Sequence, residues 1–165
     1  MALQKSVGLN YSLGVEGQEV VIGQAKYLSY NPLSDGTVKA GAFCFKKAVT
    51  GDGEAVGHVS LTGTGAPLGF VERVVDTYIN LENADSTEVY PEGAAVTVAI
   101  RGQFYIKAPA AISADGLGVF VNPTTGAIAI KASAGTGEED TGFICRLPNG
   151  ATSAAAGDIV VIEKF

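Results

Sequence analysis

Residues able to do chemistry are few in this chain, and they lie apart in the sequence. His58 is the only histidine, and Ser60 follows it at a spacing that puts both side chains on one face of a predicted strand. Nucleophilic catalysis by such a pair needs a serine on a strained turn and a histidine oriented by a further group. Ser60 is not in a G-x-S-x-G turn. We therefore interpret His58 as a strand histidine and predict no catalytic residue.

Two other motifs lack the context that their chemistry needs. The stretch from Gly63 to Gly69 contains a G-x-G element, but a phosphate-binding loop must be followed by a helix, and the next segment predicts a strand. We interpret it as a tight loop between strands. The acidic cluster Glu138-Glu139-Asp140 lacks the alternating pattern of a calcium loop, so we expect a solvated loop there.

The two cysteines, Cys44 and Cys145, lie beside aromatic residues, which is typical of buried thiols that act as small apolar side chains. One histidine and no C-x-x-C pair do not give the ligand spacing of a zinc site. We predict no metal and no cofactor.

Composition narrows the class of protein. Of the 165 residues, 47% are hydrophobic and 17% are charged, which favours a folded core over a disordered chain. The net charge of -6 without a basic cluster argues against nucleic-acid binding. The longest apolar runs, such as 94–100, are far shorter than the roughly 18 to 20 residues of a membrane helix, so we expect no membrane partner. The first ten residues do not resemble a secretory signal.

The segments that must position these residues have the sequence patterns of β-strands. Short runs rich in Val, Ile, Phe, Tyr and Thr alternate with turns rich in Gly, Pro, Asn and Asp, and no helical periodicity is present. We predict an all-β fold, a compact β-barrel or β-sandwich. The segment Asn122–Gly126 predicts a tight hairpin with Gly126 in the left-handed conformation. The predicted strands are 41–49, 55–61, 68–81, 94–100, 103–107, 118–121, 127–132, 142–147 and 158–165.

A short internal sequence repeat suggests that the β-domain has two related halves. Gly69-Phe70-Val71-Glu72-Arg73 recurs as Gly142-Phe143-Ile144-Cys145-Arg146, and similar strands flank each copy. We predict a pseudo-repeat of residues 38–107 and 112–165, in which Phe70 corresponds to Phe143 and Arg73 to Arg146. A chance match of common β-sheet residues is the alternative.

The first 37 residues differ from the predicted β-domain, residues 38–165. Glycines interrupt short apolar pieces, and such a stretch buries little surface on its own. We expect an extended N-terminal arm, residues 1–37, that orders on a neighbouring subunit, where strand addition would satisfy its backbone groups. The predicted partner-binding residues are Leu3, Leu9, Tyr11, Leu13, Val15, Val20, Val21 and Ile22.

Several motifs together resemble a known family. These are Gly65–Arg73, Tyr78, the Pro91-Glu92-Gly93 turn, Val96, Gly102–Ile106 and a second glycine-bounded unit from Gly116 to Gly126, with Met1–Gln4 and Gly14–Gln18 at the start. They resemble the structural cement proteins of tailed bacteriophages, which typically carry a G-x-x-x-G-F-V-x-R segment, a P-x-G turn and a G-[D/Q]-F-[W/Y]-V strand. The resemblance covers most of residues 1–130, and the segments 142–146 and 158–165 depart from it.

The resemblance implies an accessory capsid protein without catalysis. Its expected partner is the major capsid protein, and its expected place is the outer surface of the virion capsid, after synthesis in the host cytoplasm. Because identical subunits usually assemble with closed symmetry, which also removes sheet edges, we expect a homo-oligomer, a trimer or alternatively a dimer. Its few charges favour apolar contacts over salt bridges.

Two other classes of function remain as alternatives at this stage. One is a β-rich adhesion or carbohydrate-binding fibre module, against which the absence of tryptophan counts. The other is a small hydrolase on a β-barrel, against which the unsupported His58 counts.

Overall fold

The computed structural model describes residues 14–47, 57–74 and 89–165, and these residues form an all-β fold. Their only helical element is a single 3-10 turn, Pro148–Gly150, and they contain no helix of the length and hydrophobicity that crossing a membrane requires. The strands are β1 (Lys26–Tyr27), β2 (Leu33–Ser34), β3 (Phe43–Lys47), β4 (His58–Ser60), β5 (Gly69–Val71), β6 (Val98–Lys107), β7 (Gly118–Val121), β8 (Ile128–Lys131), β9 (Glu139–Arg146) and β10 (Ile159–Lys164).

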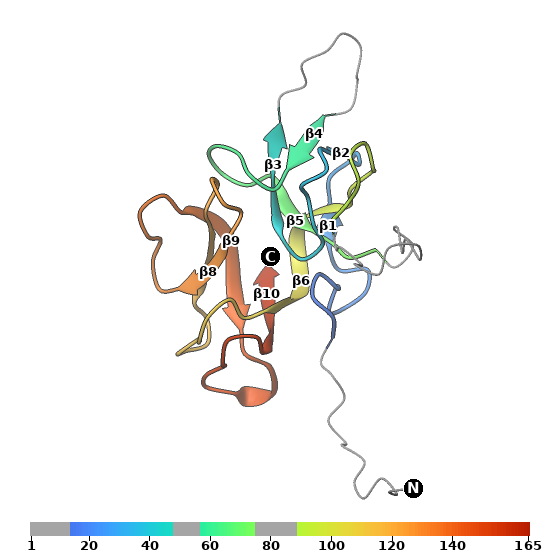
Figure 1. Ribbon diagram of the computed structural model, residues 1–165. Coiled ribbons are helices and arrows are strands. Elements are labelled where there is room, and N and C mark those ends of the chain that lie inside the picture. The colour runs from blue at the N-terminus through green and yellow to red at the C-terminus, as the bar shows by residue number, and fades with distance from the viewer. Residues whose placement is uncertain (1–13, 48–56, 75–88) are drawn as a thin grey trace, which may run out of the picture.

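The strands form one sheet in the order β2-β4-β3-β5-β6-β10-β9-β7-β8, with β1 paired to β6. β2 and β8 are the two ends of this order, so the sheet is not closed into a barrel. It folds back over its own core instead, which gives a sandwich-like arrangement (Figure 1). Of the two predicted architectures, the sandwich is therefore the one that describes this chain.

β6 is the long strand that joins the two parts of the sheet. Near its start Ala99 pairs with β5, and further along Phe104 pairs with β10. The alternation of side chains changes phase between these points, because Ala99 and then Phe104 and Ile106 face the same core. Gly102 lies at the change with φ 135°, and a Cβ atom there would approach the Cβ of Ala25 to 2.9 Å. Glycine thus allows the change of phase, and β6 joins the strands predicted at 94–100 and 103–107 into one.

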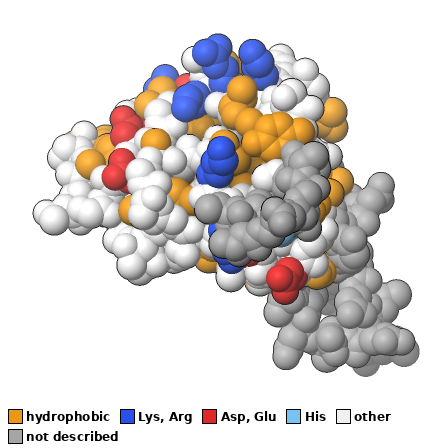
Figure 2. Space-filling view, turned by 90° about the horizontal axis from the view of Figure 1, so that it is seen from above, with side chains coloured by type: hydrophobic (Ala, Val, Ile, Leu, Met, Phe, Trp, Pro, Cys, Tyr) orange, Lys and Arg blue, Asp and Glu red, His pale blue; other side chains and the backbone are white. Residues whose placement is uncertain are grey.

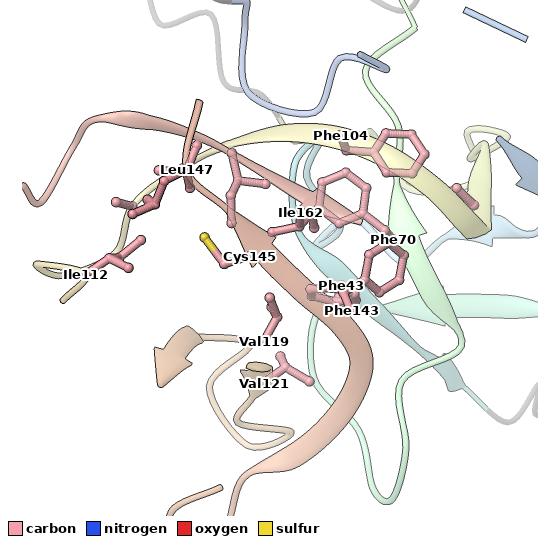
Figure 3. Packing of buried hydrophobic residues seen from close by; sticks show 14 of the residues in the cluster. Phe43, Phe70, Phe104, Ile112, Val119, Val121, Phe143, Cys145, Leu147 and Ile162 are labelled. Carbon is pink, nitrogen blue, oxygen red and sulfur yellow. The ribbon is translucent and has the colours of Figure 1, made fainter. Parts of the chain in front are cut away.

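The main core lies inside the folded sheet and is rich in phenylalanine. Phe43, Phe70, Phe104 and Phe143 are almost fully buried, and the ring centroids of Phe70 and Phe104 are 4.9 Å apart. Phe43 of β3 lies edge-on to Phe143 of β9, with centroids 5.5 Å apart, although three strands separate β3 from β9 in the sheet. Figure 3 shows these rings converging with Ile162, Val119 and Cys145. This contact joins two strands that are far apart in the sheet order, and it holds the two parts of the folded sheet together over the core.

A second, smaller core covers the opposite face of the first strands. Alternation along β3 and β5 sends Phe43 and Phe70 to the main core and Cys44 and Val71 to the second one. Its buried residues are Val38, Ala40, Cys44, Val59, Val71, Tyr90, Ala94, Val96 and Val98, and the partly buried Leu28 and Leu68 pack against them.

The two halves of the sheet have the same order of pairing. In the first half β3 pairs with β4 and with β5, and β5 pairs with β6. In the second half β7 pairs with β8 and with β9, and β9 pairs with β10. Phe70 in β5 and Phe143 in β9 therefore occupy matching strands. This order supports the predicted pseudo-repeat of 38–107 and 112–165, for which superposition of the halves is the direct test.

Local turn chemistry follows the sequence closely at the hairpin between β7 and β8. Gly126 has φ 71°, its N–H donates to the Asn122 carbonyl at 2.7 Å, and the Asn122 side chain accepts from the N–H of Thr124 at 2.9 Å. The predicted hairpin is confirmed. The prediction of a loop at the acidic cluster was wrong for two residues, because Glu139 and Asp140 belong to β9.

Candidate partner-binding surface

The described part of the predicted arm, residues 14–37, lies along the β-domain of its own chain. The N–H of Gly17 donates to the Tyr105 carbonyl at 2.8 Å, and the N–H of Val20 donates to the Gln103 carbonyl at 2.8 Å. Further on, β1 pairs with β6, and β2 pairs in parallel with β4. Residues 14–37 thus have backbone partners in their own subunit. The prediction that the arm also contacts a neighbouring subunit now depends on the side chains that these residues expose.

Glu19 organises the loop between the first contact with β6 and β1. Its side chain is buried, and its two carboxylate oxygens accept hydrogen bonds from three successive backbone N–H groups: Gly23 at 3.1 Å, Gln24 at 2.9 Å and Ala25 at 2.6 Å. A carboxylate that accepts several N–H groups is held in one geometry, and so is the loop around it. The loop 20–25 is therefore a preorganised turn.

This turn and Val15, which precedes it, present apolar side chains to solvent. Ile22 is 89% exposed, Val15 is 51% exposed and Val21 is 42% exposed, whereas Val20 is half-buried. Three of the four predicted partner-binding residues within the described range are therefore exposed large hydrophobic side chains. The other four, Leu3, Leu9, Tyr11 and Leu13, lie outside the described residues. An exposed isoleucine at the tip of a rigid turn is suited to insertion into an apolar surface.

Two carboxylates, those of Glu19 and Glu72, lie near the Tyr27 hydroxyl. Burial raises the pKa of Tyr27 above its ordinary value, and the neighbouring carboxylates of Glu72 and Glu19 raise it further. Burial also raises the pKa of Glu72; the hydrogen bond from Tyr27 opposes this, and the charge of Glu19 adds to it. The side-chain N–H of Arg73 donates to the Glu16 carbonyl at 2.8 Å and ties the segment to the loop after β5.

The surface charge is uneven despite the net acidity. Figure 2 shows a face on which hydrophobic side chains gather in a patch bordered by Lys and Arg side chains, while Asp and Glu side chains are scattered around it. Such a face can bind a partner through apolar contact with little repulsion from acidic side chains.

The residues considered for catalysis have structural surroundings. His58 is half-buried in β4, opposite Leu33 of β2 and Lys47 of β3. The Ser60 hydroxyl is buried, lies 3.3 Å from the Thr37 hydroxyl and accepts from the N–H of Thr62. The glycine-rich loop from Gly63 lies between β4 and β5, so a strand follows it and not a helix. The loop therefore lacks the strand–loop–helix context of a phosphate-binding loop.

The two cysteines are free and buried in the described fold. Burial raises the pKa of Cys44 to about 12 and that of Cys145 to about 11. Within the described ranges, no group of three or more His, Cys, Asp or Glu residues is placed to hold a metal ion.

Sequence reasoning identified the apolar residues of the turn but missed Glu19, the residue that fixes them. Its neighbours in sequence give no capping or turn signal, because its three N–H donors lie four to six residues later. Its role is visible only once the chain has turned back on itself.

Comparison with known proteins agrees with this architecture. A solved structure titled "The capsid of Myoviridae Phage XM1" contains a chain that is similar in fold, with a TM-score of 0.63 at 16% identity; the match covers 99% of this chain and 97% of that one. No curated protein sequence matches. The model of the phage family described as structural cement protein (E217 gp24/Pam3 gp6) matches residues 3–164, nearly the whole chain. The chain therefore belongs to the structural cement protein family of phages.

Proposed function

We propose that this chain is a non-enzymatic capsid cement or decoration protein that binds the outer face of a phage head and stabilises contacts between major capsid subunits. Family membership supports a structural role in the capsid; the outer face and the major capsid protein as partner belong to the proposal. The observation that carries it is the turn held by Glu19, which keeps Ile22 89% exposed.

The contact would act by mass action. A protein that binds the assembled shell and not the separated subunits stabilises the shell by the free energy of binding. Many identical contacts of modest strength add up over a closed shell. In this proposal the binding residues are Leu3, Leu9, Tyr11, Leu13, Val15, Val20, Val21 and Ile22, and the protein acts as a homo-oligomer, a trimer or alternatively a dimer.

The test uses heads that lack the protein, with purified protein added back. Ile22→Asp is expected to weaken binding about 30-fold, the equivalent of about 2 kcal/mol for a central interface residue. Its own folding stability should be unchanged because Ile22 is 89% exposed. The control Ala110→Asp adds the same charge at another exposed position and should bind as the wild type does. Equal binding by Ile22→Asp would contradict the proposal.

A truncation gives a second test, and the structure decides where it ends. Removing residues 2–20 would also remove Glu19 and the backbone contacts to β6. Removing residues 2–13 leaves both in place and should weaken binding to heads without unfolding the protein.

Raising salt to about 1 M should not release the protein from intact heads, because apolar contacts are not screened; release by salt alone would indicate a surface held by charge.

A further inference from the structure

β8 is an open edge of the sheet. It is the last strand of the order and, among the described residues, pairs only with β7. The Asn122 N–H donates to the Ala127 carbonyl at 2.9 Å, which directs the backbone of Ala127 toward β7. Because antiparallel ladders alternate, Ile128 and Ile130 then direct their N–H and C=O groups outward. Two residues of β8 can thus accept a further strand.

This edge lacks the usual protection. Exposed edges are commonly blunted by an unpaired lysine, a proline or a bulge. β8 carries only Lys131, whose ammonium is paired with Glu138 at 2.7 Å, and its register with β7 is regular. Ile128 and Ile130 also pack on the main core, so the edge is apolar as well as open.

In the first half of the sheet, the strand that corresponds to β8 has its outer edge covered by another strand. β4 corresponds to β8, since each is the outer partner of the first strand of its half. The outer edge of β4 is covered by β2: the N–H of Leu33 donates to the Gly57 carbonyl, and the N–H of Asp35 donates to the Val59 carbonyl, both at 3.1 Å. Along the described chain, β8 has no such cover.

The sequence before residue 14 has the pattern of a strand that could supply it. Val7, Leu9, Tyr11 and Leu13 alternate with Ser6, Gly8, Asn10 and Ser12. Strict alternation of apolar and polar residues is typical of a half-buried strand. Residues 6–13 carry no charge, as befits a partner for the uncharged stretch Ile128-Ala129-Ile130.

The positions of the two edges favour an intermolecular pairing. Phe104 of β6 has Glu19 on one side and Ile162 of β10 on the other, so residues 17–20 and β8 lie at opposite edges of one run of strands. Five strand spacings separate them, about 24 Å along the sheet. Leu13 is only four residues from Gly17, a span of at most about 14 Å. Figure 1 shows the two edges on opposite sides of the molecule.

We propose that residues 6–13 of one copy add as a strand to the outer edge of β8 of a second copy. This deepens the proposed function, on which it rests for the role of the arm, by naming the neighbour as another copy of this chain. The contact is head-to-tail, since donor and acceptor are different surfaces. Head-to-tail contacts close into rings when the rotation permits, which favours a trimer over an isologous dimer.

The test separates donor from acceptor in solution. Ile130→Pro removes an outward N–H that the added strand needs, and proline is tolerated at such an edge position. Deletion of residues 2–13 removes the donor. The wild type should form a closed oligomer by analytical ultracentrifugation at about 100 μM, each variant alone should be monomeric, and their mixture should give a 1:1 dimer. A monomeric wild type, a variant that assembles as the wild type does, or a mixture of folded variants that stays monomeric would overturn the proposal.

Hydrogen exchange provides a readout that does not depend on how well Ile130→Pro folds. In the wild type the amides of Ile128 and Ile130 should be protected, and deletion of residues 2–13 should expose them at least tenfold while Ala129 stays protected. Unchanged exchange at Ile128 and Ile130 would count against strand addition. If the deletion abolishes binding to heads but leaves the oligomer intact, this inference fails and the proposed function stands. If wild-type oligomers form but do not bind heads, the proposed function fails and the contact between copies stands.

Discussion

The two halves of the sheet share one order of pairing but differ in what covers them. β3–β6 carry a core on each face, and the second core includes no residue of β7–β10. β2 covers the outer edge of β4, and residues 17–20 with β1 cover the free side of β6. β8, the counterpart of β4, ends the sheet. The N-terminal segment thus completes the first half, and the second half keeps an open edge.

The shared core gives the largest test of the correspondence. Phe70 and Phe143 lie in strands with the same order of pairing, β5 and β9, and their ring centroids are 6.3 Å apart. Phe70→Ala should lower the free energy of unfolding by about 4 kcal/mol and Phe143→Ala by about 3, since both leave a large cavity. Phe70 should cost more because it has the closer ring contacts, at 4.9 Å to Phe104 and 5.3 Å to Phe43.

Urea denaturation of both single variants and the double variant checks this. The double variant should lose less than the sum of the two, because the residues share one cluster. Additive losses, or one variant without effect, would mean that the halves do not share a core in the way the pairing implies.

The cover on β4 gives a smaller effect. Ser34 of β2 is fully buried; its hydroxyl donates to the Tyr90 carbonyl at 3.0 Å and accepts from the N–H of Gly36 at 3.0 Å. Ser34→Ala leaves both groups without this partner and should cost about 2 kcal/mol. The control Ser133→Ala, at an exposed position after β8, should change the unfolding free energy by less than about 0.5 kcal/mol. Equal effects in thermal denaturation would indicate that β2 contributes little to the first half.

Strand positions followed from the sequence where the signals are local. The strand predicted at 118–121 is β7 itself, because a turn borders it on each side and the three residues after Gly118 are apolar and β-branched or aromatic. The predicted strand 142–147 begins three residues after the start of β9 and ends one residue after its end. Glu139 and Asp140 suggest a loop by charge, yet they continue the alternation in which Thr141, Phe143 and Cys145 point inward.

Features that depend on distant contacts did not follow from the sequence. The close approach of Ala25 to Gly102 in β6 joins residues far apart in the chain, and the turn at Ile22 depends on a carboxylate whose donors become neighbours only after folding. The sequence predicted contacts of the arm with a neighbour beyond those with its own domain, because its apolar residues are sparse, but it did not show how closely residues 14–37 follow their own sheet. Backbone hydrogen bonding to an open side of β6 does not need apolar residues, and composition therefore underestimates it.

The contribution of one carboxylate to stability at neutral pH should be larger in the first half, at Asp35, than in the second half, at Asp115. Burial raises the pKa of Asp35, but hydrogen bonds from Thr37 and Lys47 outweigh it and hold the pKa below its ordinary value. Such a group stabilises the fold above the unfolded pKa, near 4, and this contribution is lost as the pH falls through the lower folded pKa. Asp35→Asn should cost about 1 kcal/mol at pH 7.

Urea denaturation between pH 7 and pH 3 measures this. The difference between the wild type and Asp35→Asn should shrink below about pH 4. The second-half control is Asp115→Asn: the N–H of Leu147 and the Arg146 guanidinium lower the pKa of Asp115, but it is exposed. Its effect should be smaller, since water screens the charge. A larger effect of Asp115→Asn would reverse this ranking of the halves.

The smallest expected effect concerns which half opens first. Cys44 lies in the second core of the first half, whereas Cys145 lies in β9, in the half without that core. Burial raises both thiol pKa values, to about 12 and about 11, so at pH 8 neither forms much thiolate in the closed fold. Alkylation therefore reports opening. With iodoacetamide and peptide mapping by mass spectrometry, Cys145 should be labelled faster than Cys44, and both far more slowly than in urea. Faster labelling of Cys44 would mean that the second core does not stabilise the first half against opening, and that the difference between the halves lies in their edges alone.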